Sequence, residues 1–118
     1  MASITGLGGA FIRAESPEDL YAWYELHLGL QRSQGALSFP ASTQRASLVV
    51  AFFRKQDEYF PLAQRAMLNF QVDDLDGLLE RLESEGVAVD AKRESYEFGK
   101  FGWFTDPEGN RVELWQPT

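Results

Sequence analysis

The stretch from residue 101 to residue 115 constrains the fold of this chain most: it reads Phe-Gly-Trp-Phe-Thr-Asp-Pro-Glu-Gly-Asn-Arg-Val-Glu-Leu-Trp. Its centre, Asp106–Gly109, has the residues of a type I turn. The aspartate accepts local backbone hydrogen bonds, the proline presets φ, and the glycine tolerates the left-handed region. Aromatic and branched residues of high strand propensity lie on both sides of the turn. The stretch therefore predicts a β-hairpin.

Glu113 lies in the second strand of this predicted hairpin, between Val112 and Leu114. A carboxylate in an apolar strand either points to solvent, as most charged side chains do, or points into a polar cup. The hairpin alone leaves both interpretations open. Glu113 belongs to a site only if the rest of the chain supplies partners for it.

The first half of the chain has the pattern of one helix among several strands. A helix is predicted at Pro17–Leu28, because Ser16 offers an N-cap, proline suits the first helical position and apolar residues recur at helical spacing. Gly29 follows as a C-terminal cap. Strands are predicted at 7–13, in two short pieces within 31–39, and at 47–53.

The second half repeats this order after a charged segment, 54–63, that has neither a helical nor a strand period. A strand is predicted at Met67–Val72, a helix between the cap residue Asp73 or Asp74 and Gly86, a strand at 87–91 and a polar loop at 92–100. Two equivalent α+β modules are therefore expected, each with a helix covering one face of its sheet. In the strand at 67–72, Leu68, Phe70 and Val72 form the helix-facing side, and Met67, Asn69 and Gln71 form the other side.

Composition removes several classes of function. The chain has no cysteine, which excludes disulfides, thiolate metal sites and cysteine nucleophiles. Its formal net charge of −7 makes nucleic acid and anionic membranes poor partners and attracts cationic small molecules. No apolar run reaches membrane-spanning length, and the N-terminus lacks the pattern of a signal peptide, so a cytoplasmic location is expected.

Residues 106–114, Asp-Pro-Glu-Gly-Asn-Arg-Val-Glu-Leu, resemble the closing hairpin of the vicinal oxygen chelate superfamily, which includes glyoxalase I, the extradiol dioxygenases, and the bleomycin and fosfomycin resistance proteins. Residues 13–30 and 67–75 resemble the beginnings of that superfamily's two modules. The resemblance implies an α+β fold in which two βαβββ modules form a curled mixed sheet around a cup, with the helices outside. It implies one domain over residues 1–118, with module one at about 4–54, a linker at about 55–65 and module two at about 66–117. It also implies a homodimer.

In metal-binding members of that superfamily, the residue at the position of Glu113 is a ligand, and a histidine opens the first strand of one or both modules. Here Gly9 and Met67 hold the histidine positions, and Leu48–Val50 offer no ligand for the fourth position. His27, the only histidine, falls at the end of the first predicted helix. One carboxylate is too few donors for a divalent metal, so no metal and no cofactor are expected.

A buried Glu113 without a metal would need a cation or a proton, and Arg13 and Arg111 share its predicted side of the sheet. An apolar concavity with a few convergent polar groups is typical of a small-molecule pocket, although the same side chains could simply fill a core. The predicted ligand-binding residues are Phe11, Arg13, Phe52, Met67, Asn69, Gln71, Trp103, Arg111, Glu113 and Trp115.

Two functions therefore stay open. The first is a metal-free relative of the bleomycin resistance type that binds a small organic molecule, aromatic or cationic, in the cup. The second is a glyoxalase-like lyase or isomerase that uses Glu113 as general acid or base, or as the sole remaining metal ligand. The sequence offers no second catalytic group, so the interpretation leans away from an enzyme. A structural partner domain, the third possibility, would have a filled cup.

Overall fold

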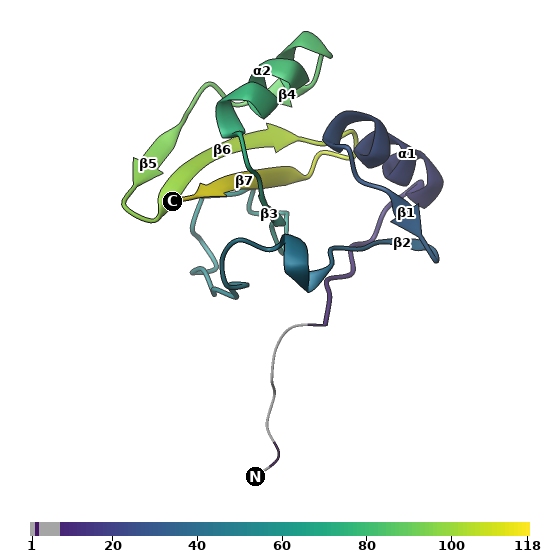
Figure 1. Cartoon of the computed structure of the whole chain (residues 1–118), viewed down its shortest axis with the longest axis horizontal. Helices are drawn as coiled ribbons and strands as arrows, with labels where there is room; N and C mark the ends of the chain where they lie inside the picture. The colour runs from purple at the N-terminus through teal and green to yellow at the C-terminus, as the bar shows by residue number, and fades with distance from the viewer. Residues whose placement is uncertain (1, 3–7) are drawn as a thin grey trace.

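The computed structural model describes residue 2 and residues 8–118 of the chain. The fold class is α+β, as predicted (Figure 1). The described residues form two α-helices, one five-stranded mixed sheet and one two-stranded antiparallel sheet. The elements are α1 (Pro17–Leu28), β1 (Arg32–Ser33), β2 (Ala36–Leu37), the 3-10 helix η1 (Ala41–Thr43), β3 (Asn69–Gln71), α2 (Leu75–Ser84), β4 (Ala88–Val89), β5 (Glu94–Tyr96), β6 (Gly99–Thr105) and β7 (Arg111–Pro117).

The larger sheet is built around the predicted hairpin, β6–β7. Its strand order is β3-β7-β6-β4, and β5 also pairs with β6. The β3–β7 pair is parallel, and the other pairs in this sheet are antiparallel. At the turn between β6 and β7, the Gly109 N–H donates to the Asp106 carbonyl over 3.0 Å, and Gly109 has φ +84°. The turn chemistry predicted for Asp106–Gly109 is therefore confirmed.

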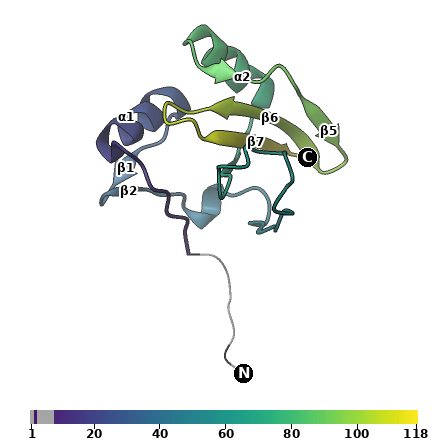
Figure 2. The ribbon, with the colours of Figure 1, turned by 180° about the vertical axis from the view of Figure 1, so that it is seen from behind.

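Both helices cover the same face of this sheet. A single apolar cluster joins Tyr24 of α1 to Leu75, Leu79 and Leu82 of α2 and to residues of β6 and β7. Figures 1 and 2 show α1 and α2 on one side of the β6–β7 hairpin and the chain between residues 44 and 68 on the other side. The apolar residues at helical spacing predicted for Pro17–Leu28 do pack against the core. The opposite face of the sheet is left for the candidate site.

The hairpin turn is tied to the start of α1. Ser16 occupies the N-cap position, as predicted, but its side chain makes no capping hydrogen bond. The Glu108 carboxylate accepts from the backbone N–H groups of Glu15 and Ser16 instead, over 2.7 and 3.0 Å. The Tyr24 hydroxyl donates to the buried Asp106 carboxylate over 2.9 Å. These bonds join the two halves of the chain.

Two of the strands predicted for the first half are not formed. Leu7 lies outside the described residues, and residues 8–13 and 47–53 run without sheet hydrogen bonds. Apolar composition favours a strand there, but a strand needs a neighbour to satisfy its backbone groups, and no strand among the described residues pairs with these segments. Their side chains face solvent: Phe11 is 99% exposed, Phe52 97% and Ile12 44%.

The second half follows the prediction more closely. Asp74 caps α2 by accepting from the Gly77 N–H over 3.0 Å, and Gly86 follows the helix with φ +82°. The predicted loop at 92–100 is partly wrong, because Glu94–Tyr96 pairs with β6 as strand β5. None of the helices in the described residues is long and apolar enough to cross a membrane.

Candidate functional site

Glu113 points into the concave face of the larger sheet and not to solvent; it is 7% exposed. Its carboxylate accepts hydrogen bonds from three neutral donors that come from three parts of the chain. The Asn69 amide donates to Oε2 over 2.6 Å, and the Trp103 indole donates to Oε1 over 3.2 Å. The Tyr59 hydroxyl also donates to Oε1. Three hydrogen bonds to the carboxylate offset much of the cost of removing it from water.

The cationic partners expected for Glu113 are not found. Arg13 is exposed, in the segment that forms no strand. The Arg111 guanidinium donates from Nη1 to Asp90 over 2.9 Å and from Nε to the Tyr59 carbonyl over 3.1 Å. The guanidinium carbon lies 5.0 Å from the centroid of the Trp103 ring. Neutral donors have therefore taken the role that the sequence assigned to an arginine.

Tyr59 contacts Glu113 but was not among the residues predicted from the sequence. Its ring meets the Trp103 ring edge-on, with centroids 5.8 Å apart, and stacks on Phe53 at 5.3 Å. Burial and the hydrogen bond to Glu113 raise the pKa of Tyr59, so its hydroxyl keeps its proton and donates. The signal in the sequence was the aromatic pair Tyr59-Phe60 inside a segment whose charges otherwise suggested a plain linker.

Residues 53–65, here called the covering segment, are held against β7 by more than Tyr59. The Gln64 amide pairs with the backbone of Arg111, donating to its carbonyl over 2.8 Å and accepting from its N–H over 2.8 Å. Gln71 anchors the preceding chain in the same way, donating to the Ala46 carbonyl over 3.0 Å. The chain itself therefore occupies part of the concave face.

The remaining predicted residues divide into two groups. Trp115 lies on the concave face, with its ring parallel to Phe101 at 6.0 Å and its indole N–H donating to the Phe98 carbonyl over 3.0 Å. Met67 is half-buried just before β3. Phe11 and Phe52 lie in solvent. The structure thus brings Asn69, Trp103 and Glu113 into contact, places Gln71, Arg111 and Trp115 on the same strands around them, and leaves Phe11, Arg13 and Phe52 apart.

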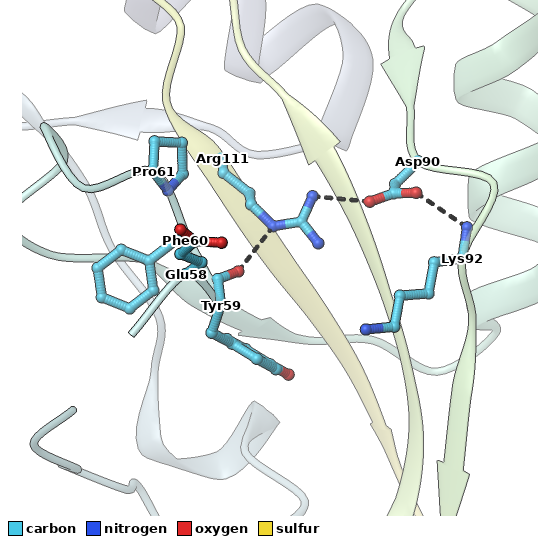
Figure 3. A pocket seen from close by; sticks show the side chains of 7 residues that line it. All are labelled: Glu58, Tyr59, Phe60, Pro61, Asp90, Lys92 and Arg111. Carbon is cyan, nitrogen blue, oxygen red and sulfur yellow. Dashed lines mark hydrogen bonds and ion pairs between the residues drawn. The ribbon is translucent and has the colours of Figure 1, made fainter. Parts of the chain in front are cut away.

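A pocket of about 410 Å³ opens beside the covering segment (Figure 3). Three of its charged residues, Asp90, Lys92 and Arg111, come from the sheet side of the pocket. The Lys92 backbone N–H and the Arg111 guanidinium hold the pKa of Asp90 below its usual value. The volume falls in the range of small-molecule sites. The lining residues are Glu58, Tyr59, Phe60, Pro61, Asp90, Lys92 and Arg111.

The residues around Glu113 do not fit a metal ion. Its three contacts are O–H and N–H donors, which compete with a cation for the carboxylate. In the part of the chain that the structure describes, no group of three or more histidine, cysteine, aspartate or glutamate side chains could hold a metal. Gly9 stands at a position where the resemblance places a metal-binding histidine; it is exposed and has no side chain that could bind a metal.

Comparisons with known proteins agree with this fold. Residues 6–114 match the family model described as Glyoxalase/Bleomycin resistance protein/Dioxygenase superfamily. TnmS3, an antibiotic binding protein from Streptomyces sp. CB03234, is 25% identical, with a TM-score of 0.65 and 100% of both chains covered. A lactoylglutathione lyase from Agrobacterium tumefaciens is 16% identical, with a TM-score of 0.61 and coverage of 97% of this chain and 95% of that one. A superfamily member from Sphaerobacter thermophilus DSM 20745 is 19% identical, with a TM-score of 0.58 and 98% of both chains covered. A comparison with curated proteins gave no match.

Proposed function

The chain belongs to the glyoxalase/bleomycin resistance protein/dioxygenase superfamily, and we propose that within it this protein binds a small organic molecule, without a metal, on the concave face that carries Glu113. The observation that carries the proposal is the set of neutral donors around Glu113. Tyr59, Asn69 and Trp103 hold the carboxylate as a hydrogen-bond acceptor in a largely apolar surround. A ligand that offers a donor can take the place of the Tyr59 hydroxyl.

The aromatic surface around Glu113 supports a ligand with a flat ring. The half-buried Tyr59 ring meets the fully buried Trp103 at one part of the concave face, and the half-buried Trp115 pairs with the buried Phe101 at another. Tyr59 and Trp115 therefore present the accessible aromatic surface. Aromatic side chains of this kind provide stacking and edge contacts worth about 0.5–1.5 kcal/mol each beyond buried area. TnmS3, which is similar over the full length of both chains, is an antibiotic binding protein, and this similarity supports a small organic molecule as the ligand.

We also propose a homodimer in the cytoplasm. The support for the dimer is the row of apolar side chains that the two unpaired segments, 8–13 and 47–53, leave in solvent. Single exposed apolar residues are ordinary, but contiguous apolar segments are typical of surfaces that another chain covers. The exposed residues are Phe11, Ile12, Leu48, Val49, Val50, Phe52 and Phe53.

A thermal-shift screen of the purified full chain tests the binding function. Aromatic cations, aromatic acids and neutral aromatic compounds are compared, and hits are confirmed by calorimetry on wild type and Glu113→Gln. We expect at least one class to bind and Glu113→Gln to weaken it. Zinc, nickel and manganese are titrated in parallel. One equivalent of metal bound at micromolar affinity, and lost in Glu113→Gln, would contradict the proposal.

A further inference from the structure

The Arg111 guanidinium is fixed in place with donors to spare. Its Nε and Nη1 atoms donate to the Tyr59 carbonyl and to Asp90. Within the described residues, Nη2 donates to no protein group, and Figure 3 shows it facing the pocket. A guanidinium that two hydrogen bonds already orient loses little freedom when a ligand binds to the third nitrogen.

Lys92 brings a second cation to the same space. Its ammonium pairs with Glu94 over 2.9 Å, which leaves further N–H groups available, because an ammonium has three donors. Figure 3 shows Nζ directed from the other side toward the space that Arg111 Nη2 faces, beside the Tyr59 ring. Both cations lie near Trp103: the Lys92 Nζ atom is 5.8 Å and the Arg111 guanidinium carbon 5.0 Å from the centroid of its ring.

The acidic residues of the pocket are mostly engaged already. Asp90 accepts from the Lys92 backbone N–H through Oδ1 and from Arg111 through Oδ2, each over 2.9 Å. Glu58 also lines the pocket, but it is exposed and keeps its hydration. Apart from the exposed Glu58 carboxylate, the hydrogen-bonding side chains that remain available in the pocket are the N–H donors of Arg111 and Lys92, and these call for an anionic acceptor.

The opposite wall is apolar. Tyr59, Phe60 and Pro61 of the covering segment line it, and Tyr59 presents its ring beside the two cations (Figure 3). A group bound between Arg111 and Lys92 would thus have an aromatic surface next to it. The pocket, of about 410 Å³, has room for one or two rings and an acid group.

We propose that this pocket binds the carboxylate of an aromatic acid between Arg111 Nη2 and Lys92 Nζ, with the ring of the ligand against Tyr59 and Pro61. This inference rests on the proposed binding of a small organic molecule on this face of the sheet, and it names a ligand class for the pocket beside Glu113, whose lining does not include Glu113 itself. The net charge of −7 favours cationic ligands at long range and so opposes this inference. Short contacts with two positioned donors outweigh that effect, because salt screens the long-range field.

Three naphthyl probes of one shape and different charge test the inference: naphthoate, naphthylmethylammonium and naphthylmethanol, each titrated calorimetrically into the full chain. We expect naphthoate to bind at least about tenfold more tightly than the other two. Lys92→Gln, an exposed change that should not disturb folding, weakens naphthoate by about tenfold and leaves naphthylmethanol unchanged. Arg111→Lys weakens naphthoate as well, because a lysine cannot keep both anchoring hydrogen bonds.

Lys100→Gln is the matched control. It removes the same charge from an ion pair with Asp76 that lies outside the pocket, so it should change naphthoate binding by less than about twofold. Equal binding of the three probes, tighter binding of the ammonium, or equal losses in Lys92→Gln and Lys100→Gln would overturn the inference and leave the binding function standing. If no naphthyl probe binds while the wider screen finds a ligand, the inference is wrong. If neither finds a ligand, both proposals fail.

Discussion

Trp103 and Glu113 lie directly opposite each other on β6 and β7, and the Trp103 indole donates to the Glu113 carboxylate over 3.2 Å. The pairing follows from the register of the hairpin, which places both side chains on the concave face. Asn69 completes the row, because the parallel pairing of β3 with β7 sets it opposite Glu113 on the other side. The backbone of the sheet therefore fixes two of the three donors, and Tyr59 comes from outside it.

Replacing Glu113 with glutamine should destabilise the fold. All three neighbours of the carboxylate are donors, so the new amide N–H₂ group would face a donor and leave at least one buried group unpaired. We expect a loss of about 1–3 kcal/mol in the free energy of unfolding, measured by urea denaturation. Glu80→Gln, on the exposed side of α2, is the control and should change the free energy by less than about 0.5 kcal/mol. Equal values for the two variants would mean that the Glu113 hydrogen bonds contribute nothing.

Much of the second half could be predicted from sequence, because its signals are local. The Asp106–Gly109 turn and the Asp74 cap each depend on residues within a few positions, and both are confirmed. The alternation of β3 also placed Asn69 on the side of Glu113 correctly. Local pattern was sufficient wherever a turn, a cap or a single face decided the structure.

The rest depended on contacts between distant residues. Tyr59 and Glu113 are 54 positions apart, and no period in a charged segment reveals that one side chain will reach the other. Arg111 was a candidate partner for Glu113, but it donates to Asp90 and to the Tyr59 carbonyl instead. At 8–13 and 47–53, composition favoured strands, yet no neighbouring strand pairs with either segment in the described chain.

Stability should fall at alkaline pH through two tyrosines, the buried Tyr24 and the half-buried Tyr59. Burial raises the pKa of Tyr59, with its hydrogen bond to Glu113 adding to the effect, and burial with the nearby Asp106 raises the pKa of Tyr24. Each hydroxyl holds its proton more tightly in the folded than in the unfolded state. Its contribution to stability is therefore complete at a pH below the unfolded pKa of 10.0 and is lost as the pH rises above that value. We expect the free energy of unfolding to decline above pH 10.

Urea denaturation between pH 8 and about pH 11.5 measures this decline. Tyr59→Phe and Tyr24→Phe should each flatten the curve above pH 10, and the double variant should flatten it most, because phenylalanine has no proton to lose. If both single variants decline as steeply as wild type does, the tyrosine hydroxyls are not responsible for the alkaline loss.

A methyl group at Gly102 should disturb the contact between α2 and β6. A Cβ atom built there would lie 2.6 Å from Leu79 Cδ1, and Leu79 is fully buried. We expect Gly102→Ala to cost about 1–3 kcal/mol of stability, as overpacked core positions do. A double-mutant cycle with Leu79→Ala should show coupling, because the smaller side chain removes the clash. Gly9→Ala, where a Cβ would meet nothing within 4 Å, is the control and should leave stability nearly unchanged.

The homodimer prediction can be tested through the exposed apolar segments. Sedimentation equilibrium at micromolar concentration should give twice the chain mass of 13.4 kDa. Phe11→Ser and Phe52→Ser should shift the equilibrium toward monomer, because each removes a large apolar side chain that is almost fully exposed in the single chain. Leu26→Ser is the matched control: Leu26 is an exposed apolar residue of α1 outside both segments, and its replacement should leave the dimer intact. A wild-type mass near 13.4 kDa, or equal effects of all three variants, would contradict a dimer formed through these segments.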